Sequence, residues 1–351
     1  MIDLTTTYMG LDLKNPLIVA SCGLTKSLQS IEKAAEAGPG AIVLKSLFEE
    51  QILAETEELV EESDHAAHSE ALDYLQGYGH ALGPREYLAL VRDAKRAVDM
   101  PVIASVNCIS SERWVEYARE LEKAGADGLE VNIGFLPNDA KIPGTEVEER
   151  YVKILAAVRA HVDLPVALKV GPYFSSFAHL ADRLANVRMA APPFTVGWSG
   201  PGETEKKVTW QGADALVLFN RFYRFDIDID NLQLAGGNPY STSEEMHVSL
   251  RWISLLAGRV DCDLAATTGV HTPQDAIKQL LAGATTVQLC SALYRHGFAR
   301  IGEILDGMQS WMEDHGYTRL DDFRGRLSQA RSDDPDAFER VQYIKALVGI
   351  E

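Results

Sequence analysis

Residues 264–297 read LAATTGVHTPQDAIKQLLAGATTVQLCSALYRHG, and this stretch decides the fold. A short apolar run at Leu264–Thr268 leads into a segment with helical periodicity that ends at Gly283, a residue type that commonly closes helices. A second apolar run, Thr286–Ser291, begins almost at once and leads into another helical segment. Strand, helix and strand in this order are typical of parallel βα units.

The same alternation recurs along the whole chain. Helical segments end at glycine and re-enter an apolar run in EKAAEAGPGAIVLKS (residues 32–46) and in LEKAGADGLEVN (residues 121–132). Most of the runs are apolar throughout, as expected of strands that are buried on both faces. We expect eight strands, at Leu17–Ser21, Ala41–Ser46, Val102–Asn107, Gly128–Ile133, Val166–Val170, Ala215–Asn220, Leu264–Thr268 and Thr286–Ser291.

Eight consecutive βα units predict a (β/α)8 TIM barrel, an α/β fold that residues 1–351 would form as a single domain. The opening segment LTTTYMGLDLKNP (residues 4–16) alternates in polarity and predicts a hairpin that covers the barrel floor. The alternative is an open, doubly wound sheet, because periodicity does not show whether a sheet closes.

Composition and charge exclude several classes of protein. The chain is 46% hydrophobic and 24% charged, which is ordinary for a globular protein with a sizeable core. Its net charge of −18 repels polyphosphate, so we expect no nucleic-acid partner. No apolar run approaches the roughly 18 to 20 residues that span a bilayer, so we expect no membrane contact. The four cysteines have no metal or CxxC spacing and no leader precedes the first strand, which predicts a reduced, cytoplasmic protein without a metal.

Three connecting stretches are longer than such units require. Residues 47–84 and 221–243 leave the C-terminal ends of strands, where barrels of this kind build active sites, so we expect them to roof a pocket. Residues 186–211 precede a strand and should emerge on the opposite, N-terminal face. The pair Glu49-Glu50 is expected on a solvated helix face.

Polar residues stand at the C-terminal ends of the expected strands, where a barrel places its chemistry. A lysine closes each of the apolar strands AIVLK and PVALK, and a buried ammonium needs a partner because an unpaired charge is costly to bury. The partner would be an anionic ligand or, alternatively, a neighbouring carboxylate in an internal salt bridge. These strand-end residues are Ser21, Lys45, Ser46, Asn107, Asn132, Lys169, Asn220, Thr268 and Ser291.

The last two units offer an anion site. TTGVHTPQDAIK and CSALYRHG each run from a strand end through small residues into a helix start. Backbone N–H groups at such positions bind phosphate, and the loops after strands seven and eight of a barrel are a recurrent phosphate site. Ordinary turn chemistry is the alternative interpretation. Two such loops in consecutive units favour a phosphate-bearing cofactor.

With these residues laid out, the chain resembles the dihydroorotate dehydrogenase family of FMN-dependent barrels, and most closely its soluble class 1 members. The resemblance covers nearly the whole chain. The motifs that carry it are NPLIVASCG (15–23), VLKS (43–46), LEVNIGFLPN (129–138), LKVGPYF (168–174), the final TTGVHTPQDAIKQLLAGATTVQLCSALYRHG (267–297) and GYTRLDDFRGRL (316–327).

The resemblance implies that FMN lies across the strand ends, with its phosphate at the last two units. It also implies a role in pyrimidine biosynthesis and a homodimer. A lysine beside the pyrimidine edge of the ring would stabilise the anionic reduced flavin. The implied cofactor-binding residues are Ala20, Ser21, Gly23, Lys45, Ser46, Asn107, Asn132, Lys169, Asn220, Thr268, Gly269, Cys290 and Ser291.

The substrate side departs from the family pattern. In class 1 members the loop after strand four reads Asn-Leu-Ser-Cys-Pro-Asn, and its cysteine is the base that removes a proton from dihydroorotate. Here the loop reads NIGFLPN, and Leu136 takes the position before the proline. Leucine accepts no proton, so dihydroorotate is not the expected substrate. The remaining candidates for substrate binding are Asn132, Asn138, Asn220 and Arg221, the last as a fork for a carboxylate.

Cys108 and His80 are the alternative candidates for the base, and the resemblance adds Lys45 and Asn132 to the catalytic group. For each candidate a structural interpretation competes. Cys22 and Cys108 would be small buried thiols and His80 an ordinary loop residue. His271, just inside the phosphate loop, would be a capping or surface residue.

The leading hypothesis is an FMN-dependent oxidoreductase that takes a hydride from a CH–CH group of a small-molecule substrate. The first alternative is a non-catalytic flavoprotein that keeps FMN after losing the base. The second is a lyase or aldolase in which Lys169 or Lys45 forms a Schiff base. Neither an iron–sulfur motif nor a second nucleotide-binding pattern is visible.

Overall fold

The strands form a closed barrel. The structure is a computed structural model that describes residues 2–52, 83–110, 115–134, 136–185, 212–221 and 224–338. Eight parallel strands follow one another around the ring, and pairing of Ile42 with Val102 joins the two ends of the sheet. The predicted (β/α)8 barrel is confirmed, and the open sheet is excluded. The eight strands are β3 (Leu17–Val19), β4 (Ala41–Val43), β6 (Val102–Cys108), β7 (Gly128–Ile133), β8 (Val166–Val170), β9 (Ala215–Leu218), β12 (Asp263–Ala266) and β13 (Thr286–Leu289).

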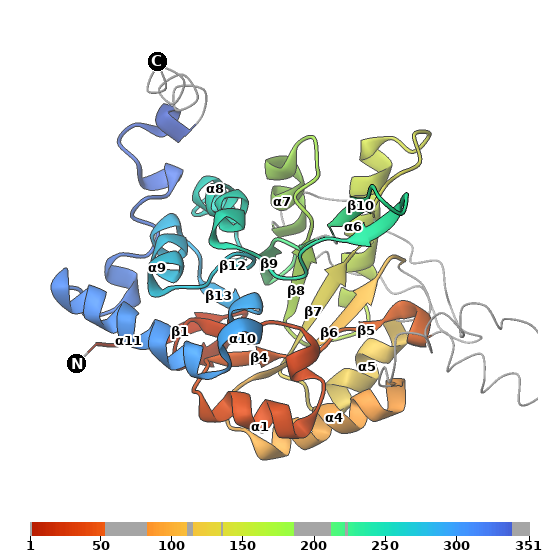
Figure 1. The fold of residues 1–351 in the computed structure, drawn as a ribbon, viewed down its shortest axis with the longest axis horizontal. Coiled ribbons are helices and arrows are strands. Elements are labelled where there is room, and N and C mark those ends of the chain that lie inside the picture. Colours follow the sequence, from red (N-terminus) through yellow and green to blue (C-terminus); the bar gives the residue numbers. More distant parts are fainter. Residues whose placement is uncertain are drawn as a thin grey trace, which may run out of the picture.

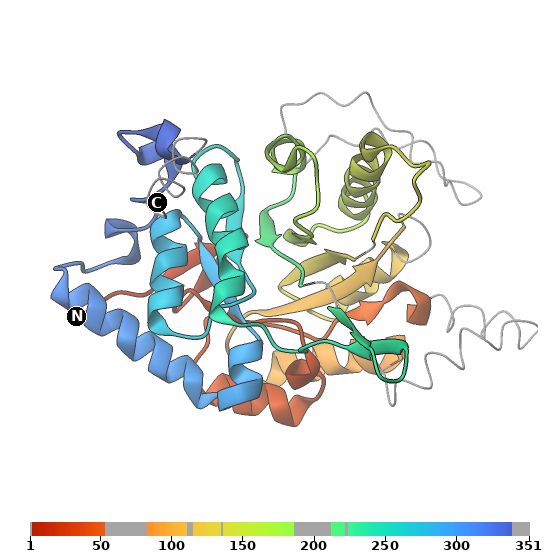
Figure 2. The ribbon, with the colours of Figure 1, turned by 45° about the horizontal axis from the view of Figure 1, so that its top comes forward.

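Helices surround the barrel on its outside (Figure 1; Figure 2). Strand β5 (Leu47–Phe48) extends the ring beside β6. None of the described helices is long and apolar enough to cross a membrane. The helices are α1 (Leu28–Glu36), α4 (Pro84–Ala97), α5 (Val115–Lys123), α6 (Gly144–Arg159), α7 (Phe177–Ala185), α8 (Met246–Leu256), α9 (Pro273–Ala282), α10 (Ser291–His296) and α11 (Ala299–Asp314), with short 3-10 turns η1 (Gly23–Thr25), η2 (Ser243–Glu245), η3 (Leu320–Asp322), η4 (Gln329–Arg331) and η5 (Pro335–Phe338).

Alternation along each strand sorts side chains between the barrel interior and the layer under the helices. The opening hairpin, β1 (Thr6–Tyr8) and β2 (Leu11–Leu13), packs into the lower interior against residues such as Ile18 and Ile103, so it covers the floor as predicted. The outer layer holds most of the apolar core and also Cys108.

The upper rim differs from the sequence prediction at Glu49. This carboxylate is only 4% exposed and accepts backbone hydrogen bonds from Ile109 (2.8 Å) and Ser110 (3.0 Å). The prediction of a solvated helix face was therefore wrong for Glu49, although Glu50 is exposed. The physical reason is that the loop after β6 needs acceptors for its N–H groups, and Glu49 supplies them.

The long connections are described in part. Within the predicted roof segment 221–243, β10 (Phe225–Asp228) pairs with β11 (Gln233–Gly236) in a second hairpin beyond the C-terminal end of β9. Residues 53–82, which include His80, and residues 186–211 lie outside the described part of the chain.

Candidate functional site

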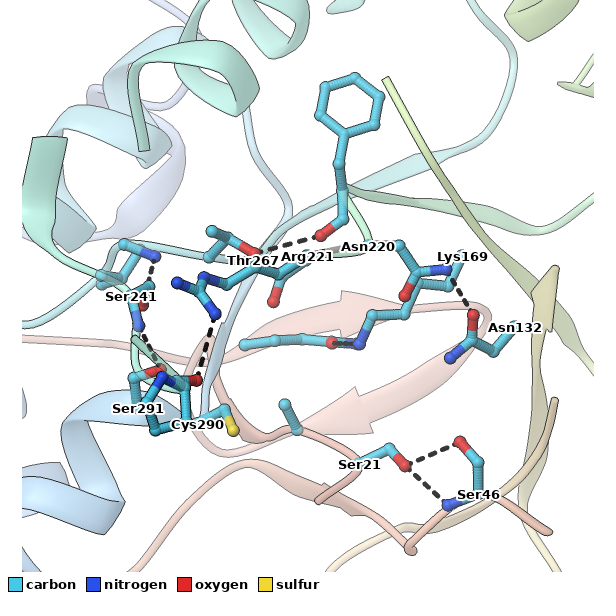
Figure 3. Close-up of a pocket in the computed structure, with 17 residues that line it drawn as sticks. Ser21, Ser46, Asn132, Lys169, Asn220, Arg221, Ser241, Thr267, Cys290 and Ser291 are labelled. Atoms are coloured by element: carbon cyan, nitrogen blue, oxygen red, sulfur yellow. Dashed lines mark hydrogen bonds between the residues drawn. The ribbon is translucent and has the colours of Figure 1, made fainter. Parts of the chain in front are cut away.

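A cavity of about 260 Å³ opens at the C-terminal ends of the strands. In Figure 3, Asn132, Asn220 and Lys169 lie at one end of the cavity, while Ser241 and Ser291 lie at the other. The lining residues are Ala20, Ser21, Ser46, Asn132, Lys169, Phe219, Asn220, Arg221, Pro239, Ser241, Thr267, Thr268, Gly269, Val270, Gln288, Cys290 and Ser291.

Most of the residues predicted to bind a cofactor line this cavity, but Gly23, Lys45 and Asn107 do not. Gly23 packs under Tyr294, whose hydroxyl would lie 2.6 Å from a β-carbon at that position. The half-buried Lys45 ammonium lies 5.8 Å from the centre of the Phe48 ring.

Lys169 is the buried cation of the cavity. Its ammonium donates to Glu130 Oε1 (3.4 Å) and to Gln288 Oε1 (3.3 Å), and Gln288 Nε2 donates to Glu130 Oε2 (2.6 Å). The internal salt bridge considered for this lysine is therefore present. An ammonium has three N–H donors, and the described part of the chain accepts from two of them, so a ligand could accept from the third. Figure 3 shows the side chain reaching into the cavity.

Hydroxyl and amide groups complete this end. Ser21 Oγ lies 3.0 Å from Ser46 Oγ, which lies 2.8 Å from the buried Ser105 Oγ. Asn220 donates its amide N–H to the side-chain oxygen of Asn132. These groups offer donors and acceptors to a flat ring with several oxygen and nitrogen atoms.

At the opposite end, backbone N–H groups cluster with hydroxyls. Ser241 N donates to Ser291 Oγ (3.0 Å) and Gly269 N donates to Ser241 Oγ (3.2 Å). Gly269 has a φ of +81°, and a β-carbon there would lie 2.5 Å from Met246 N, so only glycine fits. Ser241 was missed by the sequence prediction because it stands in a loop without a motif.

At the start of α9 the chain provides its own acceptor for the backbone N–H groups. His271 N and Thr272 N both donate to Asp275 Oδ2 (3.0 Å each), so the helix caps its own first turn. His271 is buried rather than a surface residue, and its Nε2 lies 3.3 Å from Ser241 Oγ. Burial lowers the pKa of this imidazole. The candidate phosphate site is thus the strand-end loop itself, with Thr268, Gly269 and Ser291.

Two free cysteines meet at the cavity wall. The thiols of Cys22 and Cys290 share a hydrogen bond, which lowers the pKa of Cys290 against the opposing effect of burial. The positive charges of Lys169 and Arg221 lower it further. The same hydrogen bond and burial raise the pKa of Cys22. Cys290 is therefore the more acidic thiol of the pair.

The residues predicted on the substrate side are not gathered in one place. Asn132 and Asn220 line the cavity, whereas Asn138 is exposed on the rim and Leu136 is 63% exposed there. The Arg221 guanidinium pairs with Glu245 (2.9 Å). The group that we expected to bind a carboxylate of the substrate therefore already binds a carboxylate of the chain.

No carboxylate or imidazole is among the described residues that line the cavity. Cys108 is fully buried under the helices, and burial followed by the charges of Glu49 and Glu50 raises the pKa of its thiol. Side chains alternate between the two faces of a strand, and Cys108 lies three positions after the inward-facing Ser105. Cys108 therefore faces away from the cavity. Among the described residues, no group of three His, Cys, Asp or Glu side chains is placed to hold a metal.

Similar proteins are found among dehydrogenases. The dihydroorotate dehydrogenase B (NAD(+)) catalytic subunit of Pyrococcus furiosus is 27% identical over 90% of this chain and 96% of its own length. That of Thermoplasma volcanium is 25% identical over 93% and 98%. The NAD-dependent dihydropyrimidine dehydrogenase subunit PreA of Escherichia coli K12 is 24% identical over 92% and 76%. No protein-family model matches the chain.

The chain therefore combines a closed barrel that has a cavity at its strand ends with a similarity to dihydroorotate and dihydropyrimidine dehydrogenases. At 25 to 27% identity, the chain is similar to these dihydroorotate dehydrogenase B catalytic subunits over 90% or more of its length.

Proposed function

We propose that this chain is an oxidoreductase that binds FMN in the strand-end cavity and takes a hydride from a CH–CH group of a small molecule. The observation that carries the proposal is the buried Lys169 ammonium, which lies at the end of the cavity remote from the hydroxyls of Ser241 and Ser291 (Figure 3). A cation at one end and an anion site at the other suit the ring and phosphate of FMN.

The residues of this chain fit each part of the cofactor. Lys169, Asn132 and Asn220 would hold the polar edge of the ring, and Ser291 with Gly269 would hold the phosphate. Bound FMN would supply a two-electron acceptor. The Lys169 charge would favour the anionic reduced form, because a fixed cation is strongest in a site that excludes water.

The substrate is not dihydroorotate in this proposal. Leu136 occupies the position of the family's base, and the described lining residues hold no carboxylate or imidazole to replace it. Loss of a general base typically slows proton removal by about 10²- to 10⁴-fold. Asn132 and Asn220 would bind the substrate by its oxygen atoms, while Arg221 stays bound to Glu245.

Anaerobic reduction tests the proposal. The full chain loaded with FMN is mixed with dihydroorotate, with dihydropyrimidines and with related saturated acids, and the flavin absorbance is followed. We expect bleaching by at least one compound other than dihydroorotate. Bleaching by none would favour a non-catalytic flavoprotein, and fast bleaching by dihydroorotate would contradict the proposed substrate site.

A Schiff-base lyase is the second candidate, and one observation favours it. Burial, followed by the nearby Lys26 ammonium, lowers the pKa of Lys45, and Schiff-base formation needs a neutral amine. Lys45 does not line the cavity, which makes this the weaker candidate. Borohydride trapping with a carbonyl substrate should leave Lys45 unmodified, whereas a stable adduct at Lys45 would support the lyase.

The homodimer, the cytoplasmic location and the role in pyrimidine metabolism belong to the same proposal. The homodimer and the role in pyrimidine metabolism follow from the resemblance to the dehydrogenase family, and the cytoplasmic location follows from the cysteine pattern. Light scattering of the purified chain tests the dimer, and a monomer at micromolar concentration would contradict it.

A further inference from the structure

Lys169 belongs to a buried group of three side chains inside the barrel. Glu130 is 1% exposed, Gln288 is 2% exposed and Lys169 is 7% exposed. They come from β7, β13 and β8, and all three face inward. Glu130 accepts hydrogen bonds from both partners, and Gln288 bridges the two charged groups through its amide.

The three side chains differ in their access to the cavity. Lys169 and Gln288 line it, whereas Glu130 lies behind them. The Lys169–Glu130 contact is long, at 3.4 Å, while Gln288 donates to Glu130 at 2.6 Å. The ammonium is therefore held in place without being drawn fully onto the carboxylate. A ligand in the cavity meets the ammonium directly and the carboxylate only through it.

The pair also sets the charge of the site. A lysine alone would present a full positive charge to the ligand, whereas the Lys169–Glu130 pair is neutral in sum. In a buried region this difference acts strongly, because little water screens it. The carboxylate thus limits how much an electron-rich ligand gains from the lysine.

We propose that Glu130 is a positioning residue that holds the Lys169 ammonium and, through this pair, sets the reduction potential of the bound flavin. This inference rests on the proposed FMN binding. Glu130 keeps the potential low by offsetting the cation that stabilises the anionic reduced flavin. Gln288 keeps the two charged groups at their separation.

Two substitutions of nearly unchanged size should move the potential in opposite directions. Glu130→Gln removes a negative charge behind the lysine, and Gln288→Glu adds one beside it. Relative to the wild type, Glu130→Gln should favour binding of reduced over oxidised FMN by at least tenfold, which raises the two-electron potential by about 30 mV. Gln288→Glu should lower the potential. If the substitutions acted only by damaging the fold, the direction of the shift in potential would not depend on whether a negative charge is removed or added.

The measurement is the midpoint potential of the FMN-loaded full chain, equilibrated with a reference dye. Glu148→Gln is the matched control, because this glutamate is also buried but lies on α6, outside the barrel. It should leave the potential unchanged. Lys169→Met should lower the potential. In a chain that already carries Lys169→Met, adding Glu130→Gln should shift the potential less than Glu130→Gln shifts it in the wild type.

The outcomes separate this inference from the proposed function. A wild-type chain that takes up no FMN would overturn both. If the chain binds FMN, only the role of Glu130 can be overturned. That would follow if Glu130→Gln and Gln288→Glu shift the potential in the same direction, or if neither shifts it. Opposite shifts with an unchanged Glu148→Gln control would establish it.

Discussion

Leu136 stands on the rim of the cavity where a dihydroorotate dehydrogenase would carry its base, and its side chain is 63% exposed. We expect that Leu136→Cys alone does not create dihydroorotate oxidation, because Leu136 does not line the cavity and a thiol at this position would not lie against a bound substrate. Anaerobic reduction of the bound flavin by dihydroorotate measures this, with Leu136→Ala as the control for loss of the side chain. A rate in Leu136→Cys at least 100-fold above that control would refute our account of the substrate side.

The Cys22–Cys290 pair predicts an unusual thiol. The hydrogen bond from Cys22 and the nearby cations lower the pKa of Cys290. Its thiolate should therefore form at a lower pH than the thiolate of an ordinary cysteine, whose pKa is about 8.5. Alkylation by iodoacetamide, mapped by mass spectrometry across pH, should show a midpoint below that value. Cys22→Ala removes the donor and should raise the midpoint.

Cys108 is the internal control for the same experiment. Its thiol is fully buried and its pKa is raised, so it should stay unmodified in the folded chain. Bound FMN should slow alkylation of Cys290, which lines the cavity. A midpoint for Cys290 at or above the ordinary value would show that the hydrogen bond does not govern its acidity.

Individual site residues were predictable where they stand at strand ends. Lys169 and Asn132 follow from the rule that barrels place polar groups there, and both line the cavity. Glu130 and Gln288 were not predictable, because each lies inside a strand among apolar residues and its role depends on which side chain faces it across the barrel. Cys108 shows the same limit, since one step of strand register decides which face it takes.

Among the elements, Glu49 directly follows β5 and accepts hydrogen bonds from the loop after β6. Glu49→Ala removes the acceptor of two part-buried hydrogen bonds, from Ile109 N and Ser110 N, and each such bond contributes about 0.5–1.5 kcal/mol, so the two together contribute about 1–3 kcal/mol. We expect the free energy of unfolding to fall by an amount in that range. Urea denaturation measures it.

The neighbouring Glu50→Ala is the matched control, since Glu50 is exposed and should change stability by less than about 0.5 kcal/mol. Equal effects of the two substitutions would show that Glu49 does not anchor the loops.

Element positions followed from local pattern, but element ends did not. The expected strand Thr286–Ser291 stops at Leu289, and Ser291 already belongs to α10. Its last residues leave the ladder because they turn toward the cavity. The role of Glu49 was missed for a related reason, since its partners lie some 60 residues away and an acidic pair next to a helix start looks solvated.

For the whole molecule, alternation predicted eight βα units but not closure. Closure depends on the register between β4 and β6. It also depends on the opening hairpin, which covers the barrel floor and whose Met9 N donates to Asp263 Oδ2 (2.7 Å). Both are contacts between residues far apart in the chain. The identity of the substrate is hidden for the same reason, because it depends on how rim loops meet above the cavity.

We propose that this barrel holds FMN by its phosphate at one end of the cavity and by its ring at the other. Riboflavin has the same ring without the phosphate, so equilibrium titration of both ligands against the full chain measures what the phosphate contributes to binding. We predict that FMN binds at least about 100-fold more tightly, a difference of roughly 2.7 kcal/mol, because Gly269, Ser241 and Ser291 would contact the phosphate. Equal affinities, or no binding of either ligand, would rule out this mode of binding.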